Sequence, residues 1–258
     1  MIIKSAGITI PGNIRKKNED NFYIDGHFKD DSCKDEYVLA CSNNRDHHVY
    51  AVSDGMGGHD SGEKAAWYAL EILKKFDDEN IENRLTEYIM EVNRGICMSA
   101  ASDSGRKRGA TIAIVTVNNN RFCSCTVGDS RVYVFRNNNI FRISEDHTRA
   151  QSMINSGIIS SKEAEQNKKL RILSQHLGIP ESEFIICPDI KSGLMLNKGD
   201  IILLCSDGLT DMVDDNTVRM IIGKYRDKEP ERIACELSRQ ALKNGGKDNI
   251  TVIIIKAE

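Results

Sequence analysis

The chain contains little proline and tryptophan, with four prolines and one tryptophan among its 258 residues. No stretch rich in proline, glycine or serine divides it, so a flexible linker between domains is not expected. We find no internal repeat and no low-complexity segment, which excludes repeat architectures. Because 40% of the residues are hydrophobic, the chain can bury a sizeable core. We predict a single domain spanning residues 1–258.

An excess of basic charge and long apolar runs are also absent. The net charge is −3 and the pI is about 6.1, so the basic footprint of a nucleic-acid-binding protein is missing. No run approaches the ~18 apolar residues that a membrane-spanning helix needs. The N-terminal residues MIIKSAGITIPGN lack the apolar stretch of a secretory signal peptide. We therefore expect neither nucleic acid nor membrane among the partners, and the sequence gives no indication of oligomeric state.

Eight cysteines are present, but none forms a CxxC pair or joins histidines at zinc-binding spacing. Cys125, Cys187 and Cys205 stand in apolar runs, where a free cysteine acts as a small hydrophobic residue. This usage is typical of reduced thiols and predicts a cytoplasmic location.

Hydrophobic periodicity predicts the main elements. Strands are expected at residues 2–10, 20–24, 49–53, 110–117, 121–127, 131–135, 140–143, 183–187, 200–206 and 249–256. Asparagine triplets at 118–120 and 137–139 separate neighbouring strands and indicate hairpins. Helices are expected over 66–76, 81–96 and 230–242. Hairpin-linked strands with separate long helices favour antiparallel sheets covered by helices over a doubly wound parallel sheet.

Two segments fit this pattern less well. Residues 148–180 contain short, polar and poorly periodic helical pieces, which indicates a surface insertion or a flap. Residues 26–47 carry mixed charges and two cysteines, and we expect a surface loop without chemistry there.

Three aspartates stand at the ends of apolar strands. Asp54 and Asp207 each follow such a strand and precede a glycine, and Asp248 comes just before the last strand. Gathered carboxylates repel one another unless they bind a cation or protons. Oxygen ligands without sulfur or imidazole favour Mg²⁺ or Mn²⁺ over zinc. An Asp-Gly pair is also an ordinary turn, and spacing alone does not show that the three aspartates meet.

Other polar residues stand in turns. Arg15 begins the motif RKKNED, which closes with Glu19 and Asp20. Arginine can grip a phosphate with two parallel hydrogen bonds, and the two acids could serve metal ions directly or through water. The alternative is a solvated charged turn. The loop DGMGGH ends at His59 and allows a close approach to a ligand, although it lacks the lysine of a P-loop. Asp129 stands in another turn after a strand.

Taken in order, these segments resemble the metal-dependent type-2C protein phosphatases, the PPM family, in their bacterial form. The resemblance runs from about residue 5 to residue 255. The matching motifs are RKKNED at 15–20, VSDGMGGH at 52–59, RGAT at 108–111, VGDSRVY at 127–133, SEDHT at 144–148, HLG at 176–178, LLCSDGLTDMV at 203–213 and GGKDNITVIII at 245–255. The resemblance implies an α+β fold: a four-layer α-β-β-α sandwich with two central antiparallel β-sheets flanked by helices and a flap near 148–175.

The resemblance also implies metal ligands. Asp54 matches the residue that bridges two ions, and Asp207 and Asp248 match those that complete the first site. Gly55 matches the residue that offers its carbonyl oxygen to the second ion. The implied cofactors are two Mn²⁺ or Mg²⁺ ions, with a third, weaker ion.

Four further roles follow from the same resemblance. Glu19 and Asp20 act on the second ion through water, and Asp129 joins Asp207 at the third ion. Arg15 matches the arginine that binds the substrate phosphate. The implied activity is that of a phosphoric monoester hydrolase, which releases phosphate from phosphoserine and phosphothreonine by attack of a water that bridges the metals. The implied substrates are phosphoproteins of a Ser/Thr kinase signalling pathway.

The chain departs from the eukaryotic pattern at one position. Eukaryotic members place a histidine after the Asp-Gly pair, where it can protonate the leaving group, and this chain has Met56. Bacterial members share the change and carry the histidine that matches His59. The acid therefore stays open, because His59 could instead orient a metal ligand or water. A lone histidine such as His147 is more often structural than catalytic.

Two other functions stay open at this point. The same metal site could serve a small-molecule phosphatase or a phosphodiesterase. A catalytically weak or inactive regulatory module of the same fold is the second alternative, but the three strand-end aspartates argue against it. A cysteine-based phosphatase is not expected, because no CxxxxxR loop follows Cys205.

Overall fold

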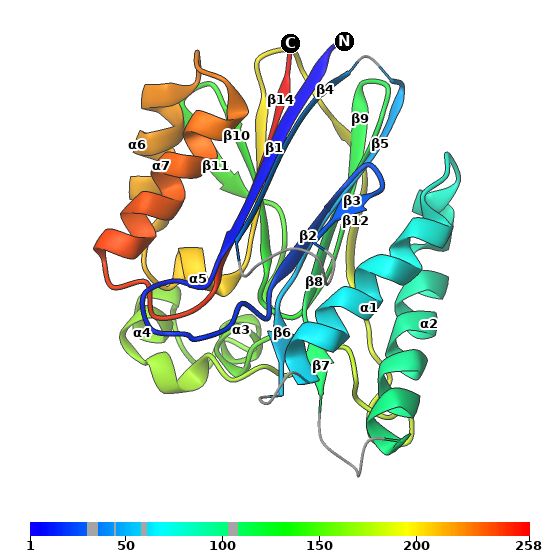
Figure 1. Ribbon diagram of the computed structural model, residues 1–258. Coiled ribbons are helices and arrows are strands. Elements are labelled where there is room, and N and C mark those ends of the chain that lie inside the picture. Colours follow the sequence, from blue (N-terminus) through cyan, green and yellow to red (C-terminus); the bar gives the residue numbers. More distant parts are fainter. Residues whose placement is uncertain (30–35, 44, 58–60, 103–107) are drawn as a thin grey trace.

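Two six-stranded β-sheets pack face to face, and helices cover the outer face of each sheet (Figure 1). The computed structural model describes residues 1–258 except 30–35, 44, 58–60 and 103–107. All strand pairs among the described residues are antiparallel. The predicted α-β-β-α sandwich is therefore confirmed.

Sheet A joins the two ends of the chain at its centre. Its strands, in spatial order, are β11 (Asn139–Arg142), β10 (Arg131–Arg136), β13 (Ile201–Cys205), β14 (Ile250–Ala257), β1 (Ile3–Ile10) and β4 (Tyr37–Asn43). The first strand of the chain pairs with the last along its whole length, from Ile3 opposite Ala257 to Ile10 opposite Ile250. This pairing brings the segment after β1 next to the segment before β14.

Sheet B faces sheet A across the central core. Its strands, in order, are β12 (Asp189–Met195), β9 (Arg121–Val127), β8 (Ile112–Asn118), β5 (His47–Ser53), β2 (Asn21–Ile24) and β3 (His27–Phe28). Two short strands, β6 (Gly55–Met56) and β7 (Gly109–Ala110), continue the pairing beyond the ends of β5 and β8. The predicted hairpins β8–β9 and β10–β11 are confirmed. Their turn residues Asn119, Asn137 and Asn138 have positive φ, a conformation that asparagine tolerates well.

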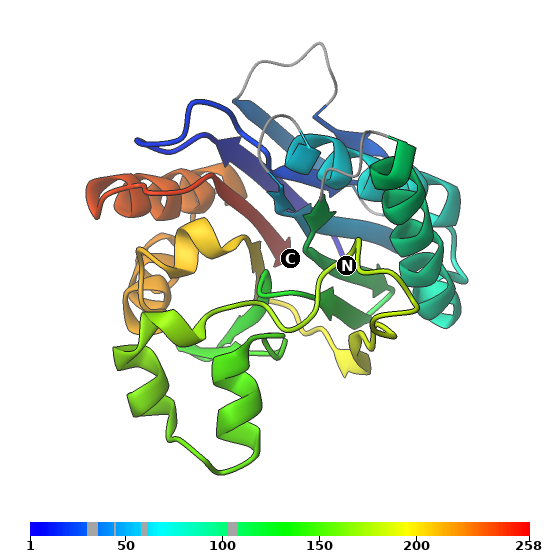
Figure 2. The ribbon, with the colours of Figure 1, turned by 90° about the horizontal axis from the view of Figure 1, so that it is seen from below.

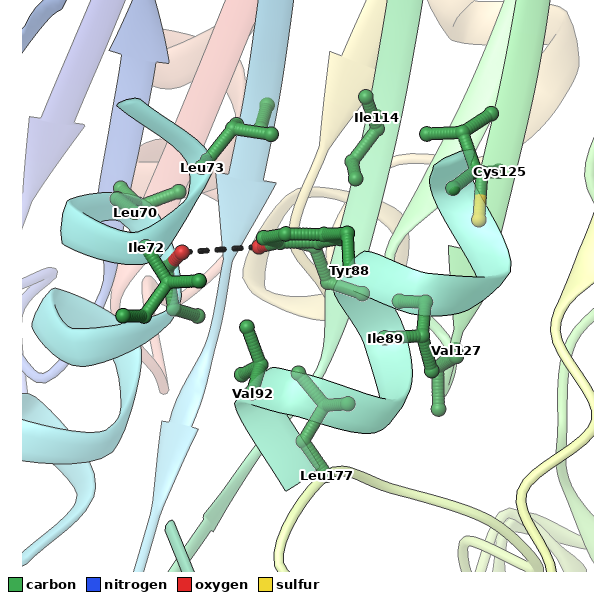
Figure 3. Packing of buried hydrophobic residues seen from close by; sticks show 14 of the residues in the cluster. Leu70, Ile72, Leu73, Tyr88, Ile89, Val92, Ile114, Cys125, Val127 and Leu177 are labelled. Atoms are coloured by element: carbon green, nitrogen blue, oxygen red, sulfur yellow. Dashed lines mark hydrogen bonds between the residues drawn. The ribbon is translucent and has the colours of Figure 1, made fainter. Parts of the chain in front are cut away.

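Helices complete the outer layers. Helices α1 (Ser61–Phe76) and α2 (Ile81–Ser102) cover sheet B, whereas α5 (Asp207–Thr210), α6 (Asp215–Tyr225) and α7 (Pro230–Lys243) cover sheet A. Three buried clusters fill the spaces between the four layers. In the cluster under α1 and α2, the Tyr88 hydroxyl donates to the Ala69 carbonyl at 2.9 Å and ties the two helices together (Figure 3).

Two predictions were wrong. Residues 183–187 are not a strand, because only Ile186 of their apolar run is buried, and Cys187 is exposed. The strand comes later, as β12 at the edge of sheet B. The segment 26–47 is not only a surface loop, since it contributes the edge strands β3 and β4 and the buried Lys29. In β4, the alternate side chains of Tyr37, Leu39 and Cys41 pack against the core between the sheets.

The predicted flap lies between β11 and β12. It contains α3 (Arg149–Asn155), α4 (Ser161–Gln166) and the short 3₁₀-helix η1 (Lys168–Leu170), and Figure 2 shows α3 and α4 projecting beside the sandwich. Thr148 and Ser160 cap the two helices through their side-chain oxygens, a contact worth about 1 kcal/mol each. No helix of the described chain is long and apolar enough to cross a membrane.

Candidate metal centre and active site

Four carboxylates gather at one end of the sandwich, because the charges of Asp20, Asp207 and Asp248 all act on Asp54. The elements β6 and α5, which adjoin Asp54 and begin at Asp207, lie at the lower end in Figure 1. In sheet A, β13 ends where β14 begins, which brings Asp207 and Asp248 to the same edge. In sheet B, β5 ends opposite the start of β2, which brings Asp54 and Asp20 to the edge that faces it. The structure therefore unites residues that stand far apart in the sequence.

The carboxylates perturb one another. Burial, followed by the charges of Asp20 and Asp207, raises the pKa of Asp54 well above its ordinary value. Burial and then the charges of Asp129 and Asp248 raise the pKa of Asp207 in the same direction. Burial raises the pKa of Asp20 to about 6. Full ionisation of this group therefore needs a compensating cation.

The donor set fits a hard divalent ion. Within the described residues, the buried oxygen Asp207 Oδ1 has no hydrogen-bond partner. No three Asp, Glu, His or Cys side chains of the described chain already converge as a closed ligand cluster. A closed cluster is not required, because Mg²⁺ and similar ions keep several waters and need few protein ligands. The carboxylates are nevertheless close enough to raise one another's pKa values. Oxygen-only donors suit such ions.

Gly55 is required by close packing. A Cβ atom on this residue would lie 2.2 Å from the carbonyl oxygen of Gly62 and 2.7 Å from that of Glu19. Gly62 is in the first turn of α1, so the two glycines allow the start of this helix to approach the segment that carries Asp54. The sequence predicted only that this glycine lets a carbonyl approach an ion.

The loop that carries Arg15 is fixed against the start of β14. The Asn249 side chain accepts a hydrogen bond from the Glu19 amide at 2.8 Å and donates to the carbonyls of Pro11 and Lys17 at 3.1 and 2.9 Å. Arg15 then reaches the centre, where its Nη2 donates to Asp248 Oδ2 at 2.7 Å. With 54% of its side chain exposed, Arg15 stays accessible to a ligand from solvent. The hydrogen bond to Asp248 and then the charge of Asp248 raise the pKa of Arg15, and the charge of half-buried Glu19 adds to this.

A buried hydrogen-bond network behind Asp20 was not predicted. Asn18 Nδ2 donates to Thr9 Oγ1 at 2.8 Å, the hydroxyls of Thr9 and Thr251 are 2.7 Å apart, and Thr251 Oγ1 donates to Asp20 Oδ2 at 2.7 Å. Lys29 adds a buried positive charge, because its Nζ donates to the Asn18 carbonyl at 2.7 Å. The network fixes Asp20. No motif marks its threonines, whose contact follows only from the β1–β14 register.

Asp129 stands on the other side of the centre. The preceding Gly128 has a φ of 103°, and its amide donates to His147 Nδ1 at 3.1 Å, so His147 helps to hold this turn. Thr111 links this turn to the centre, because its hydroxyl is 2.7 Å from that of Ser130 and accepts a hydrogen bond from the Asp54 amide at 3.2 Å. Burial and the charge of Asp146 raise the pKa of Asp129 to about 7.

A cavity of about 830 Å³ opens between this turn and the flap. Asp129 and Asp207 line it from the sandwich, and Arg171 lines it from the flap. Arg171 also pairs with Asp211, which joins the flap to the sandwich. The remaining predicted site residue, His59, lies outside the described residues.

Known proteins are similar to this chain in sequence and architecture. The family model of protein phosphatase 2C matches residues 25–244. The serine/threonine phosphatase stp of Listeria welshimeri is 30% identical over 258 residues, which cover 95% of this chain and 92% of that protein. The serine/threonine phosphatase PstP/Ppp of Mycobacterium tuberculosis has a TM-score of 0.83 and 26% identity, with 100% of both chains covered.

A further solved structure contains metal. It is the catalytic domain of the phosphatase PstP in complex with two manganese ions, with a TM-score of 0.80, 25% identity and 100% of both chains covered. The two-sheet sandwich with carboxylates at one shared edge defines the class of the PPM phosphatases. The chain belongs to the protein phosphatase 2C family.

Proposed function

We propose that this chain is a metal-dependent protein serine/threonine phosphatase, which hydrolyses phosphoserine and phosphothreonine in proteins. The observation that carries the proposal is the gathering of Asp54, Asp207 and Asp248 beside the accessible Arg15, with one buried Asp207 oxygen left without a partner. The membership of this chain in the protein phosphatase 2C family supports the same activity.

The residues of the centre divide into ion-binding and substrate-binding groups. We assign Asp54, Asp207 and Asp248 to two Mn²⁺ or Mg²⁺ ions, with the Gly55 carbonyl also at the second ion. When bound, such ions lower the pKa of a water molecule and neutralise charge on the phosphoryl oxygens. The carboxylates hold the ions at the meeting edge of two sheets, where backbone pairing fixes each strand end.

Outer residues orient this set. Glu19 and Asp20 act through water, and the threonine network holds Asp20 in one orientation. Asp129 joins Asp207 at a third ion, because its turn stands beside the centre and its charge raises the pKa of Asp207.

Arg15 binds the substrate phosphate. Its guanidinium can exchange the ion pair with Asp248 for a phosphoryl group with the same hydrogen-bonding geometry. If Asp248 held a cation, its pair with Arg15 would weaken and this exchange would be favoured. The arginine thus holds the phosphoryl group above the carboxylates that position the ions.

Phosphoproteins of an opposing Ser/Thr kinase pathway in the cytoplasm are the proposed substrates, and residues 1–258 act as one domain. A small-molecule phosphatase is the alternative that the same centre permits. Phosphate release from a phosphothreonine peptide, measured with Mn²⁺, with Mg²⁺ and after EDTA treatment, tests the proposal. Full activity in excess EDTA after metal removal would contradict it, and preference for small bis-substituted phosphate esters would favour the alternative.

A further inference from the structure

The proposed reaction leaves one proton without a donor. Cleavage of a phosphothreonine ester releases an alkoxide, which leaves poorly unless an acid protonates it. Met56, two residues after Asp54, is a thioether without a proton to give. A donor on a neighbouring segment could reach the same position from the side.

Such a segment lies next to β7. Gly55 pairs with Ala110, and Ala110 exchanges two backbone hydrogen bonds with Leu177, at 3.1 and 2.9 Å. The three segments thus form a small ladder at the end of sheet B. The row next to this one consists of Asp54, Thr111 and His176. Its first two members are joined by a backbone hydrogen bond of 2.9 Å.

The two rows point to opposite faces of the ladder, because side chains alternate along extended segments. Ala110 and Leu177 are fully buried in the cluster under α1 and α2, and Figure 3 shows Leu177 within it. Val52, which has the same orientation as Asp54, belongs to the central cluster between the sheets. His176 therefore faces the same side as Asp54, toward the carboxylate-bearing edge of sheet A.

The imidazole of His176 lies against the neighbour of Met56. A Cβ atom on Gly109 would be 2.6 Å from His176 Nδ1, and Gly109 is the register partner of Met56. His176 Nδ1 is 2.9 Å from the Leu177 carbonyl, an acceptor that requires the hydrogen on this nitrogen. The ring is thereby oriented, and no hydrogen bond within the described residues engages Nε2.

We propose that His176 is a catalytic residue that protonates the departing serine or threonine oxygen. This role rests on the phosphatase function proposed above. Two strand spacings of about 4.8 Å place the Cα atoms of Asp54 and His176 about 10 Å apart, room for an ion, a phosphoryl group and the leaving oxygen. Water attacks phosphorus and releases one proton to solvent, and the electron pair of the breaking P–O bond stays on the leaving oxygen. That oxygen takes the proton from imidazolium Nε2, and the neutral imidazole regains a proton from solvent.

Dependence on the leaving group tests this role. His176→Ala and His176→Gln are compared with the unaltered chain on a phosphothreonine peptide and on aryl phosphates of graded leaving-group acidity. We expect a loss of at least about 10-fold in kcat on the peptide, within the usual effect of a general acid. The loss should shrink as the leaving group becomes more acidic, so that the plot of log kcat against leaving-group pKa steepens.

Controls separate this role from a structural one. His27→Ala removes an exposed histidine of β3 and should leave the slope unchanged. The manganese affinity of both His176 variants, measured by calorimetry, should equal that of the unaltered chain. An equal loss on all substrates, or weakened manganese binding, would refute the role, because the histidine would then act on the fold or the ions.

His59→Ala is measured in parallel. A slope that steepens in this variant and not in His176→Ala would overturn the assignment in favour of His59. An unaltered chain without metal-dependent hydrolysis of any phosphate ester would overturn the phosphatase function itself, and the role of His176 with it. Hydrolysis with an unchanged slope in His176→Ala would overturn the role of His176 alone.

Discussion

The carboxylate centre should destabilise the metal-free protein at neutral pH, and Asp20→Asn should relieve part of this cost. Burial raises the pKa of Asp20 to about 6 from an ordinary value of 3.8, and its side chain is fully buried. A difference of about two units corresponds to about 3 kcal/mol of folding free energy. Asparagine keeps an oxygen that can accept a hydrogen bond from the Thr251 hydroxyl, so the network can persist without the charge.

The direction in which stability changes with pH depends on whether the folded or the unfolded state binds the Asp20 proton more tightly. The folded state holds the Asp20 proton to a higher pH than the unfolded state does, so acid favours folding. Stability of the metal-free protein should fall as pH rises from about 4 to about 6 and then level off. Asp20→Asn lacks this titration, and its advantage should therefore be absent in acid and full near pH 7.5, with a Tm higher by about 6–12 °C.

Guanidinium unfolding of EDTA-treated protein at about pH 4 and pH 7.5 measures the effect. Asp227→Asn is the matched control, because its side chain is 89% exposed and it removes one carboxylate without touching the centre. If Asp20→Asn and the unaltered chain lose stability in parallel between the two pH values, the argument from burial is wrong.

Three further substitutions test the proposed roles. Asp54→Asn should remove nearly all turnover while circular dichroism stays native, because a carboxylate proposed to hold the ions is lost; retained turnover would refute its role. Arg15→Ala should mainly raise KM, since the arginine binds phosphate in both the ground and the transition state; the neighbouring Lys16→Ala serves as control, and an unchanged KM would indicate a solvated turn. Asp129→Ala should lose catalysis yet keep two tight ions, and calorimetry that finds equal numbers of sites in both forms would contradict a third ion.

Local sequence patterns predicted the hairpins and the strand ends that carry the aspartates. Asparagine triplets mark reversals because asparagine tolerates positive φ, and long apolar runs mark strands that are buried on both faces. The edge strand β12 was missed because Lys191 and Ser192 are exposed and its pairing with β9 is irregular, which removes the alternating pattern. The apolar run at 183–187 imitated a strand, although Ile185 is 71% exposed.

The candidate site also contains residues that local sequence patterns predict and contacts that they do not. Asp54, Asp207 and Asp248 could be found because each adjoins a strong strand signal. The contact between Thr9 and Thr251 could not, because it joins opposite ends of the chain and depends on the register of β1 against β14. A hydroxyl pair of this kind has no local signature.

The segment 26–47 shows how a stretch of sequence without a recognisable motif can support the candidate site. Asn21 accepts from the Lys29 amide at 3.0 Å and donates to its carbonyl at 2.8 Å, so one side chain fixes both ends of this residue. The ammonium group of Lys29 is thereby directed to the Asn18 carbonyl, within the loop that carries Arg15 and Asp20. A buried lysine is costly unless it has oxygen partners and nearby negative charge. The Asn18 carbonyl is the oxygen partner, and Asp20 supplies the nearby charge. The acids of the candidate centre thus also stabilise a fixed cation, and this couples the packing of β2 and β3 to the position of the loop that carries Arg15.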